Sequence, residues 1–233
     1  MGEINQILRL SLFIFFIPLI SINLCLFISV NYSLFDGTIF AVDFIGRSNF
    51  TIPYLDGSLS ISRASRTYPQ YLIFKPAMVI TSLMLIYYWS KTNSFLKTVL
   101  SKEKNFYFKF FGILSAIFLL IHSILLGVNF EISFLKLLKR VFLLCFILFE
   151  IAAQGTLIFI IFKNKMILKN FYSEKILKLK LFLVSILVLV ALVSLPILNS
   201  DNYTHFKHGL ERNYFIGVIG FYLLTRLFWK RTT

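Results

Sequence analysis

Glu150 is the residue of this chain whose surroundings could most readily support acid–base chemistry. It lies near the middle of an apolar run at 141–162, and Gln154 follows one helical turn later, where its amide could hydrogen-bond and orient the carboxyl. His122 lies in the outer half of another apolar run, 106–127, so antiparallel packing could bring it to a similar depth. A glutamate and a histidine that meet would form a proton relay or an acid–base site.

A structural interpretation of the same residues stays open. A single glutamate in a helical bundle is often a protonated or amide-bonded packing residue, and a histidine near an interface is often solvated or bonded to a backbone carbonyl. The sequence contains no HExxH, no Ser-His-Asp arrangement, no glycine-rich phosphate loop and no Cys/His cluster. Cys25 and Cys145 both lie in apolar runs, without the spacing of metal ligands. We therefore expect no metal and no cofactor, and favour a protein that is not an enzyme.

The composition places these residues in a membrane protein. Of 233 residues, 58% are hydrophobic and 15% are charged, whereas soluble domains hold about 25% charged residues. The formal net charge is +14, but the basic residues fall in short clusters between apolar runs, as is typical of loops on the cytoplasmic side of a membrane. We therefore expect membrane lipids, and not nucleic acid, as partners.

Six apolar runs approach the length of about 20 residues that a helix needs to cross a bilayer. They are 10–30, 71–89, 106–127, 141–162, 181–198 and 213–229. The first run is too long for the core of a signal peptide and no cleavage site of small residues follows it, so we expect an uncleaved helix. The sequence thus predicts an all-α fold, in which residues 1–233 form a single membrane domain, a six-helix transmembrane bundle. We expect Glu150 to face the interior of this bundle, because exposure to lipid would leave an unpaired carboxyl in hydrocarbon.

Lysine clusters predict the orientation of this bundle, because short cytoplasmic connections are enriched in Lys and Arg. The connections 90–109 and 163–180 carry such clusters, and Lys230 and Arg231 follow the last run. The clustered residues are Lys91, Lys97, Lys102, Lys104, Lys109, Lys163, Lys165, Lys169, Lys175, Lys178 and Lys180. We expect both termini in the cytoplasm and the long first loop, 31–70, on the opposite side.

That first loop is long for a connection inside a compact domain, and loops of such length are usually functional or ordered by their own packing. Its apolar residues exceed what a disordered linker holds, so we expect a lid over the outer ends of the helices. Arg63, Arg66 and several hydroxyls, Ser62 among them, lie in its last part. Guanidinium groups pair well with phosphate, so these residues could bind an anionic headgroup. The alternative is a loop capped by its own side chains.

The end of the loop resembles the Frag/DRAM/Sfk family, whose fold also forms the N-terminal part of CWH-type proteins. There the loop after the first helix ends in a pattern like I-S-D-x-G, then Pro, then a Phe at the start of the second helix. Four positions of the stretch SISRASRTYPQYLIF match at similar spacing: Ile61, Ser62, Pro69 and Phe74. Glu211 stands where the family places an acidic residue before its last helix. The chain departs from the pattern at Arg63, Ser65 and Arg212.

The resemblance implies a distant member of a family linked to lipid handling, and it transfers no catalytic constellation. The headgroup candidates are Arg63, Arg66, Ser62 and Glu211. The favoured function is that of a non-enzymatic membrane protein that binds or organises lipids. Two alternatives stay open: an intramembrane lipid-modifying enzyme that uses Glu150 and His122, and a small transporter with Glu150 as its proton site.

Overall fold

A computed structural model describes residues 2–31, 34, 38, 52–101, 106–128, 133–199 and 203–230. Regular structure in these residues is helical, apart from one isolated bridge between Tyr172 and Trp229. The predicted all-α class is confirmed for this part of the chain.

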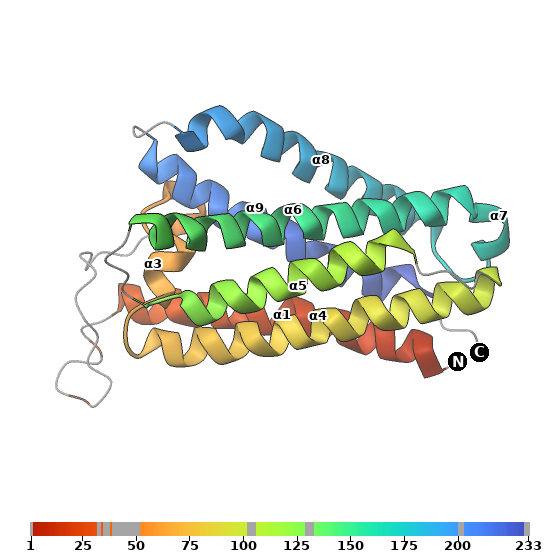
Figure 1. Ribbon diagram of the computed structural model, residues 1–233, viewed down its shortest axis with the longest axis horizontal. Helices are drawn as coiled ribbons and strands as arrows, with labels where there is room; N and C mark the ends of the chain where they lie inside the picture. The colour runs from red at the N-terminus through yellow and green to blue at the C-terminus, as the bar shows by residue number, and fades with distance from the viewer. Residues whose placement is uncertain are drawn as a thin grey trace.

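The described residues form six long helices that run side by side along the longest axis of the molecule (Figure 1). They are α1 (Gly2–Val30), α4 (Gln70–Leu100), α5 (Tyr107–Leu125), α6 (Ser133–Lys163), α8 (Glu174–Asn199) and α9 (Thr204–Phe228). The first five are long and apolar enough to cross a membrane, so the chain is a multi-pass membrane protein. The helix α9, which begins with polar residues, is not among them, and the sixth span stays a prediction.

The helices extend beyond the apolar runs of the sequence. The helix α4 continues through Lys91 and Lys97 to Leu100, and α8 begins at Glu174. Lysines that the sequence predicts to lie in connections therefore lie on helical turns. Long basic side chains permit this, because they can lay their stems along the helix while their charge reaches water. Hydropathy therefore locates the apolar middle of each helix but not its ends.

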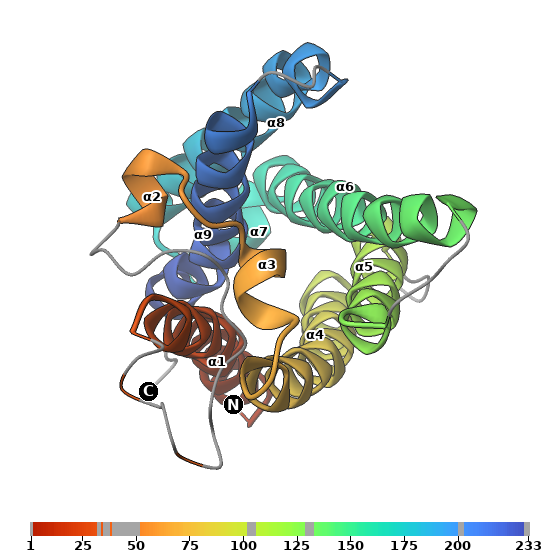
Figure 2. The same ribbon diagram turned by 90° about the vertical axis from the view of Figure 1, so that its left-hand side faces the viewer.

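Three short helices, α2 (Pro53–Asp56), α3 (Ile61–Ser65) and α7 (Lys165–Leu168), connect the long ones. Seen from the end opposite the chain termini, α1, α4, α5, α6 and α9 surround a centre that α3 covers (Figure 2). Residues 52–69, called the lid segment below, therefore lie ordered over one end of the bundle. The earlier part of the predicted loop, at 32–33, 35–37 and 39–51, lies outside the described residues.

The close packing of the bundle depends on Trp89 of α4, which is completely buried. Its ring centroid lies 5.0 Å from that of Tyr88 and 5.8 Å from that of Phe108. Gly112 of α5 lies against it, and a Cβ atom at this glycine would be 2.3 Å from the Trp89 ring. The missing side chain lets α4 and α5 approach closely, as small residues do between membrane helices.

We predict that Gly112→Ala lowers the free energy of unfolding by about 1–3 kcal/mol, because the added methyl must displace a fully buried ring. Gly220→Ala is the matched control, since a Cβ atom at Gly220 meets nothing within 4 Å. Alanine is the better helix former, so the control should be neutral or slightly stabilising. Denaturant titration of the protein in detergent micelles measures both variants, and equal effects would contradict the packing described here.

Candidate functional site

The carboxyl of Glu150 lies at the centre of the bundle and is 0% exposed. The Ser115 hydroxyl of α5 lies 2.6 Å from its Oε2, and the Gln154 amide, one turn along α6, donates to its Oε1 at 3.0 Å. The Tyr222 hydroxyl of α9 donates to the same Oε1. Three helices therefore meet at one carboxyl group. The predictions that Glu150 faces the interior and that Gln154 bonds it are confirmed.

Two of these partners also bond to the backbone of their surroundings. The Gln154 amide donates to the Val218 carbonyl of α9 at 3.1 Å, and the Ser115 hydroxyl lies 2.9 Å from the Gly112 carbonyl. Sequence analysis did not find Ser115 or Tyr222, because Ser and Tyr are common in membrane helices. The signal that could have found them is the need of a buried carboxyl for several donors.

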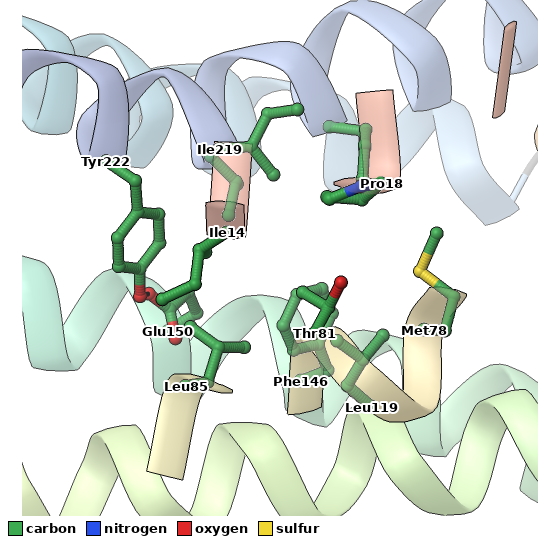
Figure 3. Close-up of a pocket in the computed structure, with 12 residues that line it drawn as sticks. Ile14, Pro18, Met78, Thr81, Leu85, Leu119, Phe146, Glu150, Ile219 and Tyr222 are labelled. Atoms are coloured by element: carbon green, nitrogen blue, oxygen red, sulfur yellow. Dashed lines mark hydrogen bonds between the residues drawn. The ribbon is translucent and has the colours of Figure 1, made fainter. Parts of the chain in front are cut away.

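A small cavity lies between Glu150 and the lid end of the bundle (Figure 3). Its volume is about 10 Å³, which is room for about one water molecule. Apart from Glu150, Tyr222 and Thr81 its walls are apolar, and they come from α1, α4, α5, α6 and α9. In Figure 3 the ring of Tyr222 points at the carboxyl of Glu150. The site is closely packed and leaves no space for a substrate.

His122 has a different role from the one that a Glu–His pair requires. It is 8% exposed, and its Nδ1 donates to the Lys139 carbonyl of α6 at 3.2 Å. It lies seven residues beyond Ser115 on α5, which separates them by about 10 Å along the helix axis. The structure therefore brings Glu150 and Gln154 together and leaves His122 out of their hydrogen-bond network.

Lys180 is a second buried ionisable residue. The sequence predicts it to lie in the cytoplasmic connection 163–180. The structure corrects this, because α8 begins six residues earlier, at Glu174, and Lys180 is 1% exposed. Its ammonium donates to the Thr225 hydroxyl of α9 at 2.7 Å. It also lies over the rings of Phe221 and Phe228, at 3.8 and 4.8 Å from their centroids. The signal in the sequence that Lys180 belongs to a helix is its position one residue before the apolar run 181–198.

The lid segment is fastened to α9 by a buried arginine and a close glycine contact. The Arg212 side chain is 0% exposed, and its Nε donates to the Leu59 carbonyl at 2.7 Å. Gly57 has φ 61°, and a Cβ atom there would be 1.7 Å from the carbonyl oxygen of His205. Gly209 is also close to Gly57, since a Cβ atom at Gly209 would be 3.7 Å from the Gly57 Cα. The lid segment and the start of α9 therefore pack together.

The predicted headgroup residues occupy different positions on the lid segment. Arg63 and Arg66 are exposed on and beside α3, while Ser62 is half-buried and its hydroxyl lies 3.3 Å from that of Ser60. Glu211 lies beneath them, where its carboxyl accepts hydrogen bonds from the backbone N–H groups of Ser62 and Ile61. The structure thus separates the two outward-facing arginines from the polar groups that hold the lid in place.

Positive charges from α4, from α6 and from Arg66, the residue that follows α3, lie near one another. The positive charges of Arg66 and Lys75 act on Lys139, which lies ahead of the apolar stretch of α6. Burial lowers the pKa of the Lys139 ammonium, and the two neighbouring cations lower it further. The Lys139 ammonium donates to the carbonyl of Val128. This group, called the cation cluster below, lies at the lid end of the bundle.

Comparison with protein-family models, curated proteins and solved structures gives no match to this chain.

Glu211 gives the lid end a pH dependence that can be measured. Burial raises the pKa of its carboxyl from 4.5 to about 7, although the Arg212 charge and the two N–H groups of α3 oppose the increase. A carboxyl whose pKa is higher in the folded than in the unfolded protein stabilises the fold at low pH and loses this contribution as pH rises through the folded value.

We therefore predict that the free energy of unfolding falls between about pH 5 and pH 8, and that Glu211→Gln flattens this dependence. The glutamine keeps an acceptor for the α3 N–H groups but cannot ionise. Denaturant titrations in detergent at several pH values measure both proteins. An identical slope in the variant would show that Glu211 does not titrate in this range.

Proposed function

We propose that this multi-pass membrane protein is not an enzyme and that it binds an anionic lipid headgroup at the lid end of its bundle. The observation that carries the proposal is the grouping of Arg66, which follows α3, with Lys139 of α6. The Arg66 backbone lies against Gly127, and the carbonyl of the next residue, Val128, accepts from the Lys139 ammonium. Lys75 of α4 adds its charge to this group. Neighbouring positive charges attract an anion, and guanidinium and ammonium groups both pair with phosphate oxygens.

A phosphate-bearing headgroup fits this cluster. Arg66 is exposed and Lys75 is half-exposed, so both can reach a ligand. The guanidinium fork binds phosphate oxygens in pairs, while an ammonium adds a compact charge. Gly127, with φ 79°, lets the lid segment approach the end of α5 closely, since a Cβ atom there would be 3.1 Å from the Arg66 carbonyl oxygen. The backbone that carries Arg66 is thus held against the bundle.

The centre of the bundle supports a non-enzymatic role. Ser115, Gln154 and Tyr222 engage the Glu150 carboxyl, and the adjoining cavity of about 10 Å³ cannot admit a substrate. An intramembrane enzyme or a transporter needs an open path for its substrate at such a residue. We accordingly assign lipid binding to the lid end and not to the interior.

Family membership and orientation are part of the same proposal. Packing of the lid segment against the start of α9 involves the two places in the chain where the resemblance to the Frag/DRAM/Sfk family lies, and so supports a distant branch of that family. The ends of the described chain lie at the same end of the bundle (Figure 1). This arrangement is compatible with six spans and with both termini in the cytoplasm, which would place the cation cluster on the opposite leaflet.

We predict that the double variant Arg66→Glu/Lys75→Glu retains phosphatidylglycerol at least about tenfold less well than the unchanged protein, as expected for the loss of charge-assisted contacts. Arg63→Glu alone should have a smaller effect, because the charge of Arg63 acts on His208, whereas those of Arg66 and Lys75 act on Lys139. Native mass spectrometry of protein released from phosphatidylglycerol or phosphatidylcholine nanodiscs measures the retained lipid.

The matched control is Lys175→Glu/Lys178→Glu, which makes the same change of charge at two exposed positions of α8. It should retain phosphatidylglycerol like the unchanged protein. Added inorganic phosphate distinguishes a lipid site from a site for free phosphate. It should displace phosphatidylglycerol from a free-phosphate site and leave it bound at a lipid site. Equal losses in the two double variants, or equal retention of the two lipids, would refute headgroup binding at the cation cluster.

A further inference from the structure

The interior of the bundle holds two ionisable side chains of opposite sign, Glu150 and Lys180, each at most 1% exposed. A charge inside a membrane protein is costly unless it is paired or neutralised. We propose that Glu150 and Lys180 form a coupled acid–base pair that exchanges one proton through hydroxyl groups of α9 and α4. The pair is a proton-binding site in the middle of the bundle, and it does not depend on lipid binding at the lid.

The surroundings of Lys180 fit an ammonium ion. Its Nζ bonds to the Thr225 hydroxyl and lies over two aromatic faces, those of Phe221 and Phe228. Ring faces attract a desolvated cation, and a hydroxyl oxygen accepts one of its protons. These contacts therefore stabilise the charged form of Lys180, although the side chain is buried.

The surroundings of Glu150 fit both of its protonation states, and Ser115 is the reason. The Ser115 hydroxyl carries one proton and lies within hydrogen-bond distance of two acceptors, the Glu150 Oε2 and the Gly112 carbonyl. With Glu150 ionised, Ser115 donates to the carboxylate. With Glu150 protonated, Ser115 accepts from the carboxyl and donates to the Gly112 carbonyl. The site can thus take up and release a proton without moving a heavy atom.

Three hydroxyl groups, those of Tyr222, Tyr88 and Thr225, lie between the two ends of the pair. Tyr222, which donates to Glu150, and Thr225, which accepts from Lys180, lie three residues apart on the same face of α9. The Tyr88 hydroxyl of α4 lies 3.4 Å from that of Thr225, and the Tyr88 and Tyr222 rings pack with their centroids 5.0 Å apart. Each of these hydroxyls can both donate and accept, as proton transfer requires.

In the described part of the chain, the other polar groups shown to contact Glu150 carry no charge of their own. They are Ser115 on α5, Gln154 on α6 and Trp89 on α4, while α1 contributes the apolar Ile14 and Pro18 to the adjoining cavity. Among the residues shown to contact it, Glu150 therefore has no cation. Lys180 bonds to the same helix, α9, one turn beyond Tyr222, and is the buried base that we assign to it. In its resting state the pair is an ammonium and a carboxylate. When the proton is exchanged, one proton leaves the Lys180 ammonium and one arrives on the Glu150 carboxylate, so the pair is neutral overall in both states.

Infrared difference spectroscopy tests the pair directly, because a protonated carboxyl and a carboxylate absorb at different frequencies. The unchanged protein minus Glu150→Gln, at neutral pH in lipid nanodiscs, should show a carboxylate and no protonated carboxyl. The difference spectrum of Lys180→Met minus Lys180→Met/Glu150→Gln should lack the carboxylate band and show the band of a protonated carboxyl. The reason is that the positive charge of Lys180 no longer favours the ionised form of Glu150. Lys178→Met, at an exposed position of the same helix, should resemble the unchanged protein.

A protonated carboxyl already present in the unchanged protein, or a carboxylate that persists in Lys180→Met, would overturn the proposal. Should Lys180→Met not fold, Thr225→Val keeps both ionisable groups and removes the connecting hydroxyl. After a pH jump, the Glu150 band should then change at least several-fold more slowly than in the unchanged protein. An unchanged rate would equally overturn the connection through Thr225.

Discussion

A carboxyl group at the centre of an apolar bundle must find hydrogen-bond donors inside the protein, because the membrane offers none. Glu150 meets this requirement with donors from Ser115 of α5, Gln154 of its own helix and Tyr222 of α9. Leaving such a group without its donors costs far more than each bond contributes when it is made. The positions of α5, α6 and α9 relative to one another are therefore tied to a single side chain, and the aromatic packing around Trp89 adds α4 to the same centre.

The two ends of the bundle serve different purposes around this centre. At the lid end, Arg212 and the contact of Gly57 with α9 hold the lid segment closed over the helices, and the exposed cations face outward. Toward the opposite end, Lys180 lies within the helix contacts of α8 and α9. The helix α8 carries many exposed apolar side chains, so much of it faces lipid. Its buried lysine is thus a specific point of attachment to α9.

The sequence was sufficient to predict the all-α class, the apolar middles of five spanning helices and the inward position of Glu150. These features follow from composition and from the cost of a charge in hydrocarbon, which are local properties. It could not predict Tyr222 or Lys180 as partners in the interior, since that depends on how α9 is rotated against α6 and α8. The depth of His122 in the bundle suggests a contact with Glu150, whereas the hydrogen bond of His122 goes to the Lys139 carbonyl. The depth of a residue in the membrane can be predicted from the sequence, but which faces of two helices pack together cannot.

The central claim is that the hydrogen bonds of Glu150 join the helices of the bundle, and a double-mutant cycle between Glu150 and Tyr222 tests it most directly. Glu150→Gln, Tyr222→Phe and the double variant would be unfolded by denaturant in identical micelles. The account predicts that the two single effects fail to add, with a coupling free energy of about 1 kcal/mol or more. Single effects that add to within about 0.3 kcal/mol would contradict it, because the two side chains would then stabilise the fold independently.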